Sequence, residues 1–321
     1  MPTQPPVRIG ARGSKLSLAQ AGMMQRRIAA ALGADPEDPQ AVEAAAPLIV
    51  ITTSGDRIQD RRLLEVGGKG LFTKEIEEAM LEGRIDCAIH SMKDMPAVLP
   101  PGLCIAAIPE REDPRDAFLS REPERLEDLA QGAVLGTASL RRQAQALHRR
   151  PDLDVRMLRG NVDTRLAKLA AGEADAILLA ASGLNRLGLG HLPKSFLDPL
   201  DCPPAPGQGA LAIETRVEDR DAPWLEAVRH GPTALAVAAE RGALTALEGS
   251  CRTAVGAFAQ LDGAEIRLVV EALSADGRHR FRREGAASLA GADPESAARE
   301  LGLALGAQVA AEGGDLILPP E

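Results

Sequence analysis

The stretch VRIGARGSKLSLAQAGMMQRRIAAAL, residues 7–32, carries the pattern on which the prediction of the fold depends. Its apolar start, Val7–Gly10, is typical of a short buried strand. In Leu16–Leu32, apolar residues recur every three or four positions, which predicts a helix. The loop between them contains Arg12 and Ser14. A strand followed directly by a helix is the repeating unit of an α/β domain with a mostly parallel sheet.

The same alternation continues through the first two thirds of the chain. Further strands are predicted at Leu48–Thr53, Asp86–His90, Ile105–Pro109, Ala133–Gly136, Val155–Leu158, Ala176–Ala180 and Ala210–Glu214. Further helices are predicted from Phe72 to about Gly83 and at Ser139–Arg150, Val162–Ala171 and Ser182–Leu187. We therefore expect ligands to bind at the carboxyl ends of parallel strands, where the loops of such folds gather.

Two breaks suggest that the chain crosses to a second lobe and returns. The first is the charged, proline-bearing segment Glu110–Arg115, and the second is the proline-rich segment Cys202–Gly209. After Pro232 the order changes, with a helix (Thr233–Leu247), two strands (Val255–Leu261 and Ile266–Ala272) and a helix (Ser296–Ala311), which predicts a smaller α+β domain. The predicted division is residues 1–109 with 210–228, residues 110–209, and residues 229–321.

Composition restricts the classes of function. The 321 residues are 45% hydrophobic, 26% charged and only 2% aromatic, with a formal net charge of −9. An acidic chain with few stacking side chains is a poor candidate for nucleic-acid binding. The N-terminus lacks the pattern of a secretory signal, and no apolar run reaches the roughly 18 residues of a membrane span. We expect a cytoplasmic protein that binds no membrane.

The cysteines and histidines argue against a metal centre. Cys87, Cys104, Cys202 and Cys251 are far apart and form no CxxC pair, and the five histidines show no metal-binding spacing. This pattern is typical of reduced thiols rather than of disulfides or a zinc site. We expect no metal.

Basic and polar residues gather where the predicted strands end. These positions are Arg12 and Ser14, then Ser91, Lys93 and Asp94, then Thr137, Ser139, Arg141 and Arg142, and finally Arg159 with Arg165. Arginine matches the planar geometry of a carboxylate, and a helix N-terminus adds unpaired N–H groups. Any single arginine could equally lie on a solvated helix face. Together they predict a site for a small substrate that carries several carboxylates.

Two further residues could carry chemistry. Asp94 is a carboxylate among cations, although a helix N-cap or a loop ion pair would also explain it. Cys251 lies in a glycine-bearing loop beside Arg252, and a nearby cation favours a reactive thiolate. Most lone cysteines are instead small core residues. The run Gly67–Gly70 lacks the spacing of a phosphate-binding loop and fits a lid at least as well.

Several motifs in register resemble one family. They are HSMKDMP (90–96), GTASLRR (136–142), LRGN (158–161), PGQG (206–209) and the loop of Cys251. In this order they resemble the porphobilinogen deaminases, or hydroxymethylbilane synthases. The resemblance begins near Val7, is strongest between Val66 and Gly209, and is thin after Val255.

The resemblance implies a fold and an activity. The fold would be two lobes similar to type II periplasmic binding proteins, with mixed, mostly parallel sheets, plus a smaller C-terminal α+β domain. The enzyme would be a monomer that condenses four porphobilinogens head to tail, releases ammonia at each step, and frees the linear tetrapyrrole hydroxymethylbilane. Its primer would be a dipyrromethane cofactor made from the substrate.

The resemblance also implies roles for individual residues. Asp94 would be catalytic, and Cys251 would hold the dipyrromethane through a thioether. Further cofactor contacts would come from Ser14, Lys93, Asp94, Thr137, Ser139, Arg141 and Arg142. The substrate would be bound by Arg12, Arg159, Arg165, Arg186, Ser91 and Gln208. Lys69 and Phe72 would belong to a lid.

Departures from the family pattern are few. Ala138 stands where many members have serine, Glu65 stands where some have lysine, and the cysteine loop reads Gly-Ser-Cys-Arg. From the residues alone, a non-catalytic receptor for an organic anion explains the arginines equally well. Such a receptor gives Asp94 and Cys251 no task. An RNA-binding enzyme is a weaker alternative, because the chain is acidic and poor in aromatics.

Overall fold

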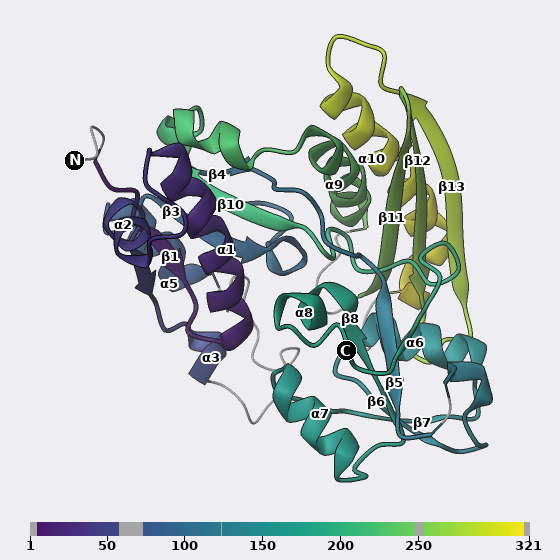
Figure 1. Ribbon diagram of the computed structural model, residues 1–321. Helices are drawn as coiled ribbons and strands as arrows, with labels where there is room; N and C mark the ends of the chain where they lie inside the picture. The colour runs from purple at the N-terminus through teal and green to yellow at the C-terminus, as the bar shows by residue number, and fades with distance from the viewer. Residues whose placement is uncertain (1–4, 58–72, 123, 248–252, 318–321) are drawn as a thin grey trace. The chain divides into compact units, whose positions relative to one another are not determined.

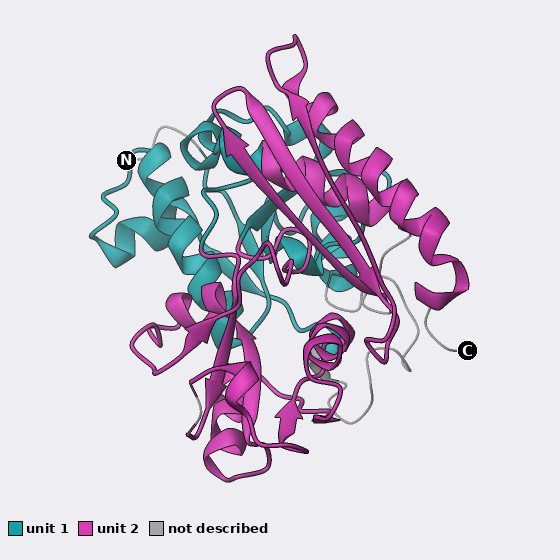
Figure 2. Cartoon of the chain, turned by 90° about the vertical axis from the view of Figure 1, so that its right-hand side faces the viewer, with its two compact units in different colours: residues 1–60, 68–112, 210–234 teal, residues 61–67, 113–209, 235–321 magenta. Residues whose placement is uncertain are grey.

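The computed structural model of the chain describes residues 5–57, 73–122, 124–247 and 253–317 (Figure 1). The chain forms two compact units (Figure 2). Unit 1 comprises Met1–Asp60, Gly68–Glu112 and Ala210–Ala234, and unit 2 comprises Arg61–Gly67, Asp113–Gly209 and Leu235–Glu321. The unit borders after Glu112 and Gly209 lie at the two predicted breaks, whereas the division into three domains stays a prediction.

Unit 1 is built on a five-stranded sheet in the order β2-β1-β3-β10-β4. Its strands are β1 (Ile9–Ala11), β2 (Leu48–Val50), β3 (Cys87–Ser91), β4 (Leu103–Ala107) and β10 (Leu211–Arg216). Strand β1 runs parallel to β2 and β3, and β10 is antiparallel to both β3 and β4. The sheet is therefore mixed but mostly parallel, as expected, because β10 alone of these strands is reversed.

Helices cover both faces of this sheet. They are α1 (Lys15–Ala31), α2 (Pro39–Ala45), α3 (Ser54–Arg57) and α5 (Lys74–Leu81), with short 3-10 helices η1 (Met92–Asp94), η3 (Val217–Asp219) and η4 (Pro223–Val228). Met24 and Ile28 of α1 pack with Ile89 on one face, and Ile76 of α5 packs with Ala88 on the other. Because side chains alternate along a strand, neighbouring residues of β3 reach opposite cores.

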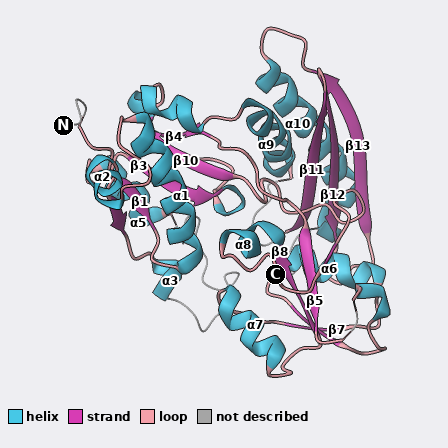
Figure 3. Cartoon of the chain, viewed as in Figure 1, coloured by secondary structure: helices cyan, strands magenta, loops and turns pink. Residues whose placement is uncertain are grey.

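Unit 2 contains a second five-stranded sheet, in the order β7-β6-β8-β5-β9 (Figure 3). Its strands are β5 (Asp116–Ser120), β6 (Val134–Gly136), β7 (Asp154–Arg156), β8 (Ala176–Ala180) and β9 (Ser195–Phe196), and its helices are α6 (Leu140–Arg149), α7 (Val162–Ala170), α8 (Ala181–Arg186) and η2 (Leu126–Asp128). Strand β6 is parallel to β7 and β8, and β5 is antiparallel to β8 and β9. The arrangement repeats the mixed, mostly parallel sheet of unit 1.

The rest of unit 2 is an antiparallel three-stranded sheet with two helices against it (Figure 3). The elements are α9 (Gly231–Ala246, of which residues up to Ala234 belong to unit 1), β11 (Ala254–Asp262), β12 (Glu265–Leu273), β13 (Arg280–Ser288), α10 (Pro294–Gly313) and η5 (Gly314–Ile317). Helices α9 and α10 approach closely at Gly302. A Cβ at this position would overlap the carbonyl oxygen of Ala239. This is the smaller α+β arrangement that the sequence predicts.

The predicted elements are present with small shifts of their ends, but strands β5, β9 and β13, helices α2 and α3, and the short 3-10 helices were not predicted. Strand β5 begins directly after the segment interpreted as a crossing, Glu110–Arg115, and was not predicted. Strand β13 alternates polar and small residues and has no apolar run, and α2 is short. In the described part of the chain, no helix has the length and apolarity that crossing a membrane requires.

Candidate functional site

The first group of predicted site residues lies around a small pocket in unit 1, which we call the β3 pocket. Its volume is about 60 Å³, and it is lined by Arg12, Ser14, Leu16, Ser17, Gln20, Thr73, Ile89, His90, Ser91 and Asp94. The carboxyl ends of the parallel strands β1 and β3 meet here. Four residues predicted separately as site residues, Arg12, Ser14, Ser91 and Asp94, therefore line one pocket.

Local hydrogen bonds fix the walls of the β3 pocket. Ser14 caps α1 by accepting a hydrogen bond from the backbone N–H of Ser17 at 3.3 Å. The Ser17 hydroxyl accepts one from the backbone N–H of Arg12 at 3.2 Å. Gln20 donates to the Ser91 hydroxyl at 3.0 Å. Side chains of a helix start and of a strand end are thereby held in register, which stabilises the pocket before a ligand enters.

Asp94 closes the 3-10 turn η1 that follows β3. Its side chain is exposed and lines the β3 pocket, while the neighbouring Lys93 is half-buried. No side-chain capping bond is formed at the start of this turn. An accessible carboxylate at a strand end, in a pocket that Arg12 also lines, can exchange protons with a bound group.

The second group of site residues lies in unit 2 around a buried carboxylate, Asp116. Arg141 donates to Asp116 at 2.7 Å, and Arg142 donates to it through Nη2 at 2.8 Å and Nε at 3.1 Å. Gln208 adds a hydrogen bond from Nε2 at 2.8 Å. The carboxylate side chain is fully buried, and the two arginine side chains are nearly so. One carboxylate thus orients three of the predicted site residues.

The ionisation of Asp116 depends on this geometry. Burial acts to raise its pKa, but the charges and hydrogen bonds of Arg141 and Arg142 outweigh burial and hold the pKa far below its usual value. Asp116 is therefore charged over the whole physiological pH range. Asp116 is not among the site residues predicted from the sequence. The sequence feature that could have identified it is an acidic residue at the start of the apolar strand Asp116–Ser120.

Thr137 and Ser139 shape the loop that leads from β6 into α6. Ser139 is the N-cap of α6 and accepts a hydrogen bond from the backbone N–H of Arg142 at 3.4 Å. Thr137 accepts one from the backbone N–H of Ser139 at 3.2 Å. Ala138 between them is exposed, so the serine hydroxyl that many family members have here would lie at the surface. The start of α6, with its arginines, is fixed by its own cap.

Arg142 and Arg159 lie close enough to Arg165 for their positive charges to act on it. Burial, and then the positive charges of Arg142 and Arg159, lower the pKa of Arg165 to about 10. The Nε atom of Arg165 is buried and has no hydrogen-bond partner among the described residues. A desolvated guanidinium beside two like charges is costly unless an anion is bound. This cluster of Arg142, Arg159 and Arg165 is the strongest physical sign of an anion site.

The other predicted residues of unit 2 are held by the backbone. Arg186, at the end of α8, donates to the carbonyl oxygen of Gly209 at 2.6 Å. Gln208 also donates to the carbonyl oxygen of Pro114 at 2.7 Å. Gly207, beside Gln208, has a φ of 74°, which favours glycine, and its N–H donates to the buried Glu240 at 2.7 Å. The PGQG motif is therefore a tight turn that positions Gln208.

Three of the predicted residues lie outside the described part of the chain: Cys251, Lys69 and Phe72. Glu65 lies outside it as well. Among the described residues, the free cysteines are Cys87, Cys104 and Cys202, and no group of His, Cys, Asp and Glu could hold a metal ion.

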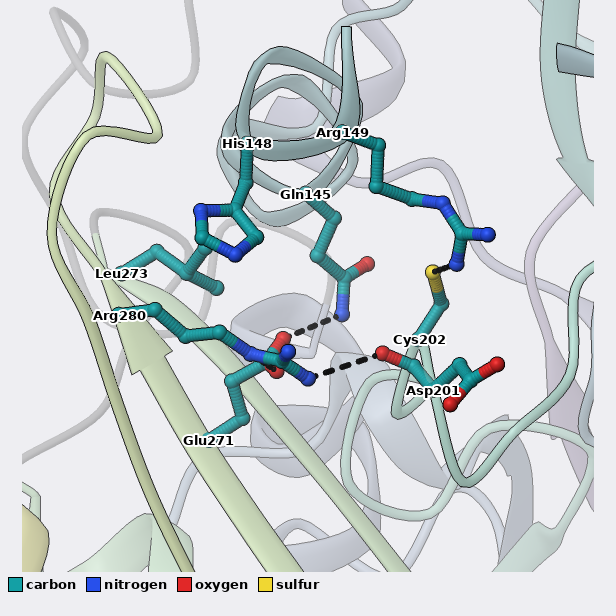
Figure 4. A pocket seen from close by; sticks show the side chains of 8 residues that line it. All are labelled: Gln145, His148, Arg149, Asp201, Cys202, Glu271, Leu273 and Arg280. Carbon is teal, nitrogen blue, oxygen red and sulfur yellow. Dashed lines mark hydrogen bonds and ion pairs between the residues drawn. The ribbon is translucent and has the colours of Figure 1, made fainter. Parts of the chain in front are cut away.

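A larger cavity of about 350 Å³ lies elsewhere in unit 2, between α6 and the three-stranded sheet (Figure 4). In its wall Gln145 donates to Glu271 at 2.9 Å, and Arg280 donates to the other Glu271 oxygen at 2.6 Å. Arg149 donates to the sulfur of Cys202 at 3.3 Å. Gln145 also accepts from Arg141 at 2.8 Å. Because these groups form hydrogen bonds with one another, we interpret the cavity as a polar junction that supports α6.

Comparisons with known proteins agree with one another. Residues 7–223 match the family model described as "Porphobilinogen deaminase, dipyromethane cofactor binding domain", and residues 234–311 match "Porphobilinogen deaminase, C-terminal domain". The chain is 73% identical over 319 residues to the porphobilinogen deaminase of Phenylobacterium zucineum (strain HLK1), with 99% of this chain and 100% of that protein covered. It is also 73% identical over 322 residues to that of Caulobacter vibrioides (strain NA1000 / CB15N), with both chains fully covered.

Among solved structures, the chain is similar to an ABC transporter or periplasmic binding protein from Brucella ovis with glutathione bound. The TM-score is 0.40 and the identity 15%, with 78% of this chain and 77% of that chain covered.

Proposed function

Because the chain belongs to the porphobilinogen deaminase family, we propose that Asp94, Cys251 and the arginines of the two units perform the reaction of that family. The enzyme is a transferase that condenses four molecules of porphobilinogen head to tail into hydroxymethylbilane, with release of ammonia, in tetrapyrrole biosynthesis. Its cofactor is dipyrromethane. When bound, this cofactor supplies the terminal pyrrole carbon to which the first substrate is joined.

The observation that carries the proposal is the cluster of Arg142, Arg159 and Arg165. Each porphobilinogen has two carboxylates, an acetate and a propionate, so every addition brings two more negative charges. Burial, and then the charges of the two other guanidinium groups, lower the pKa of Arg165, and its Nε atom has no hydrogen-bond partner among the described residues. Carboxylates bound there would relieve the repulsion between the arginines and accept planar, charge-assisted hydrogen bonds. The residues present therefore fit the carboxylate groups of the cofactor and of the substrate.

In the proposal, Arg12, Arg159, Arg165 and Arg186 bind substrate carboxylates together with Ser91 and Gln208. Cofactor carboxylates are held by Arg141 and Arg142 with the polar side chains Ser14, Lys93, Thr137 and Ser139. Arg141 and Arg142 already donate hydrogen bonds to Asp116, which keeps them ordered. A prearranged pair loses little conformational entropy when it binds an anion.

We propose that Asp94 transfers the protons of the reaction. Loss of ammonia requires a proton at the amine nitrogen, and the acceptor pyrrole must lose the proton of its reacting carbon. A protonated carboxyl group in the β3 pocket can donate the first proton and then, as the carboxylate, accept the second, so that it returns to its starting state. Its negative charge would also stabilise the electron-poor ring that forms when ammonia leaves.

Cys251 is proposed to hold the cofactor through its sulfur, and Lys69 and Phe72 to belong to a lid. We also propose a cytoplasmic monomer that binds neither membranes nor nucleic acid. The support for the last point is the formal net charge of −9 and the low aromatic content, 2%.

The role of Asp94 is tested with Asp94→Asn, which keeps the size of the side chain and removes its charge. Intact mass should still show the two-pyrrole adduct when the variant is supplied with cofactor, whereas turnover of porphobilinogen should fall by about 10²–10⁴-fold, the range of general acid–base catalysis. Asp221→Asn, in the same unit, is the control because Asp221 is 81% exposed and bonds only to a neighbouring arginine in the described structure. Near-normal turnover of Asp94→Asn would refute the assignment.

A further inference from the structure

A buried group of three ionisable side chains lies beneath the β3 pocket and has no part in the mechanism above. It consists of His90, Glu77 and Glu214, which we call the His90 cluster. Their exposed fractions are 6%, 7% and 0%. The Nε2 atom of His90 lies 3.1 Å from Oε2 of Glu214. Ionisable side chains are rarely buried this completely in a soluble domain unless structure or function requires it.

Sheet register creates the His90 cluster. Strands β3 and β10 are antiparallel, with His90 opposite Ala212 and Ala88 opposite Glu214. His90 and Glu214 are therefore diagonal neighbours on one face of the sheet. Ala88 on that face packs against α5, the helix that carries Glu77. The three side chains come from segments far apart in the sequence and meet under one helix.

The hydrogen bonds of the cluster are incomplete. Oε1 of Glu214, Oε1 of Glu77 and Oγ1 of Thr73 are buried and have no hydrogen-bond partner among the described residues. An unpaired buried polar atom is costly, and internal water is the usual way to satisfy such atoms. In the described residues no arrangement of His, Cys, Asp and Glu suits a metal ion. Water and shared protons can connect such buried oxygens.

Electrostatics favour one stored proton. Burial raises the pKa of Glu77, and the negative charge of Glu214 raises it further. Thr73 and His90 lower the pKa of Glu77. The Thr73 hydroxyl acts on the Glu77 carboxyl group although the two do not meet the geometric criteria of a hydrogen bond. Glu77 therefore holds a proton more readily than an exposed glutamate does, and a protonated carboxyl group can donate it.

The cluster reaches the β3 pocket through two of its residues. His90 and Thr73 both line this pocket, together with Asp94. Only Nε2 of His90 is engaged by Glu214, so the other ring nitrogen is available for exchange with the pocket. The charged and titratable groups around His90 are Glu214 from β10, Glu77 and Glu78 from α5, Arg12 after β1, and Lys93 and Asp94 in η1, whereas α1 presents the neutral Ser17 and Gln20.

We propose that Glu77, Glu214 and His90 form a buried proton relay that stores one proton and exchanges it with the β3 pocket. When the relay donates, the O–H bond of Glu77 breaks and a proton passes through water to Glu214. Glu214 passes this proton to Nε2 of His90, and the proton at Nδ1 of His90 leaves to Asp94, which donates it to the departing amine. The proton that the acceptor pyrrole loses at its reacting carbon returns by the same path. No electron is transferred, and each group recovers its starting state.

This inference rests on the proposed function, because the relay serves Asp94. The three residues are positioning and proton-storing residues rather than groups that touch the substrate. Fold alone does not explain them, since apolar residues of the same volume would fill the space beneath the pocket at lower cost.

The test uses Glu77→Gln in the full-length enzyme loaded with its cofactor, with Glu78→Gln as the matched control. Glutamine resembles the protonated glutamate in shape and charge but cannot release that proton, and Glu78 is exposed one position along the same helix. Three readouts are needed: the pH profile of kcat, KM, and the infrared band of a protonated carboxyl group. His90→Gln provides a second variant with a break at the other end of the relay.

The expected result for Glu77→Gln is an unchanged intact-mass adduct, a KM within about twofold, and a kcat at least about 10-fold lower. The decline of wild-type kcat with rising pH should be absent in this variant, and so should the protonated-carboxyl band. Glu78→Gln should match the wild type. A wild-type pH profile in both Glu77→Gln and His90→Gln, or a carboxyl band that persists in Glu77→Gln, overturns the relay. Either outcome would leave the Asp94→Asn result unaffected, so the two proposals fail separately.

Discussion

Substitution of Asp116 by asparagine tests the physical basis of the arginine site in unit 2. The side chain keeps its size, but it loses its charge and exchanges one acceptor oxygen for an N–H₂ donor. That donor would face Arg141 or Arg142, which are themselves donors and accept nothing. Both guanidinium groups are nearly buried, so water cannot replace the lost acceptor.

The magnitude follows from that burial. When one partner of a buried ion pair is removed and the charge of the other remains, stability falls by about 3–5 kcal/mol. For a folded unit of 150–250 residues, each kcal/mol shifts Tm by roughly 2–4 °C, so a decrease of about 6–20 °C is expected. Asp154→Asn is the control, because its pair with Arg156 is exposed on both sides and such pairs contribute at most about 1 kcal/mol.

Urea unfolding at several pH values provides the assay. The folded-state pKa of Asp116 is lowered, so its contribution is fully present above the unfolded-state pKa of about 3.9 and decreases as the pH falls below it. The stability difference between wild type and Asp116→Asn should therefore narrow in acid. A loss below about 1 kcal/mol, or a difference that does not change between pH 7 and pH 3, would show that Asp116 does not hold the two arginines.

Two further predictions concern the cofactor and chain growth. Cys251→Ala should show no covalent two-pyrrole adduct by intact mass, even after incubation with porphobilinogen, and a retained adduct would mean that another nucleophile is used. Arg159→Leu should accumulate partly elongated enzyme, visible by mass, because each addition requires more positive charge, whereas Arg156→Leu, whose side chain is 62% exposed, should elongate normally. An Arg159→Leu enzyme that differs from the wild type only in substrate affinity would contradict this.

Much of the site could be predicted from the sequence because the information is local. Strand and helix periods place Arg12, Ser91 and Asp94 after successive strands, and parallel strands bring their carboxyl ends together. In the structure these residues line the same pocket. The caps of α1, α6 and α7 are equally local, since Ser14, Ser139 and Asn161 precede their helices directly.

The sequence by itself therefore determined the order of strands and helices, the α/β class, the clustering of arginines and the family motifs. Only the tertiary structure decided which distant residues meet. Asp116 joins Arg141 and Gln208 across the sheet of unit 2, and Glu214 joins His90 across 124 positions. Such contacts depend on strand order and register, and a shift of one residue would turn each side chain to the opposite face. The local sequence pattern shows which side chains share a face of a strand, but it does not show which strand pairs with it. For that reason the buried carboxylates could be identified only from the tertiary structure.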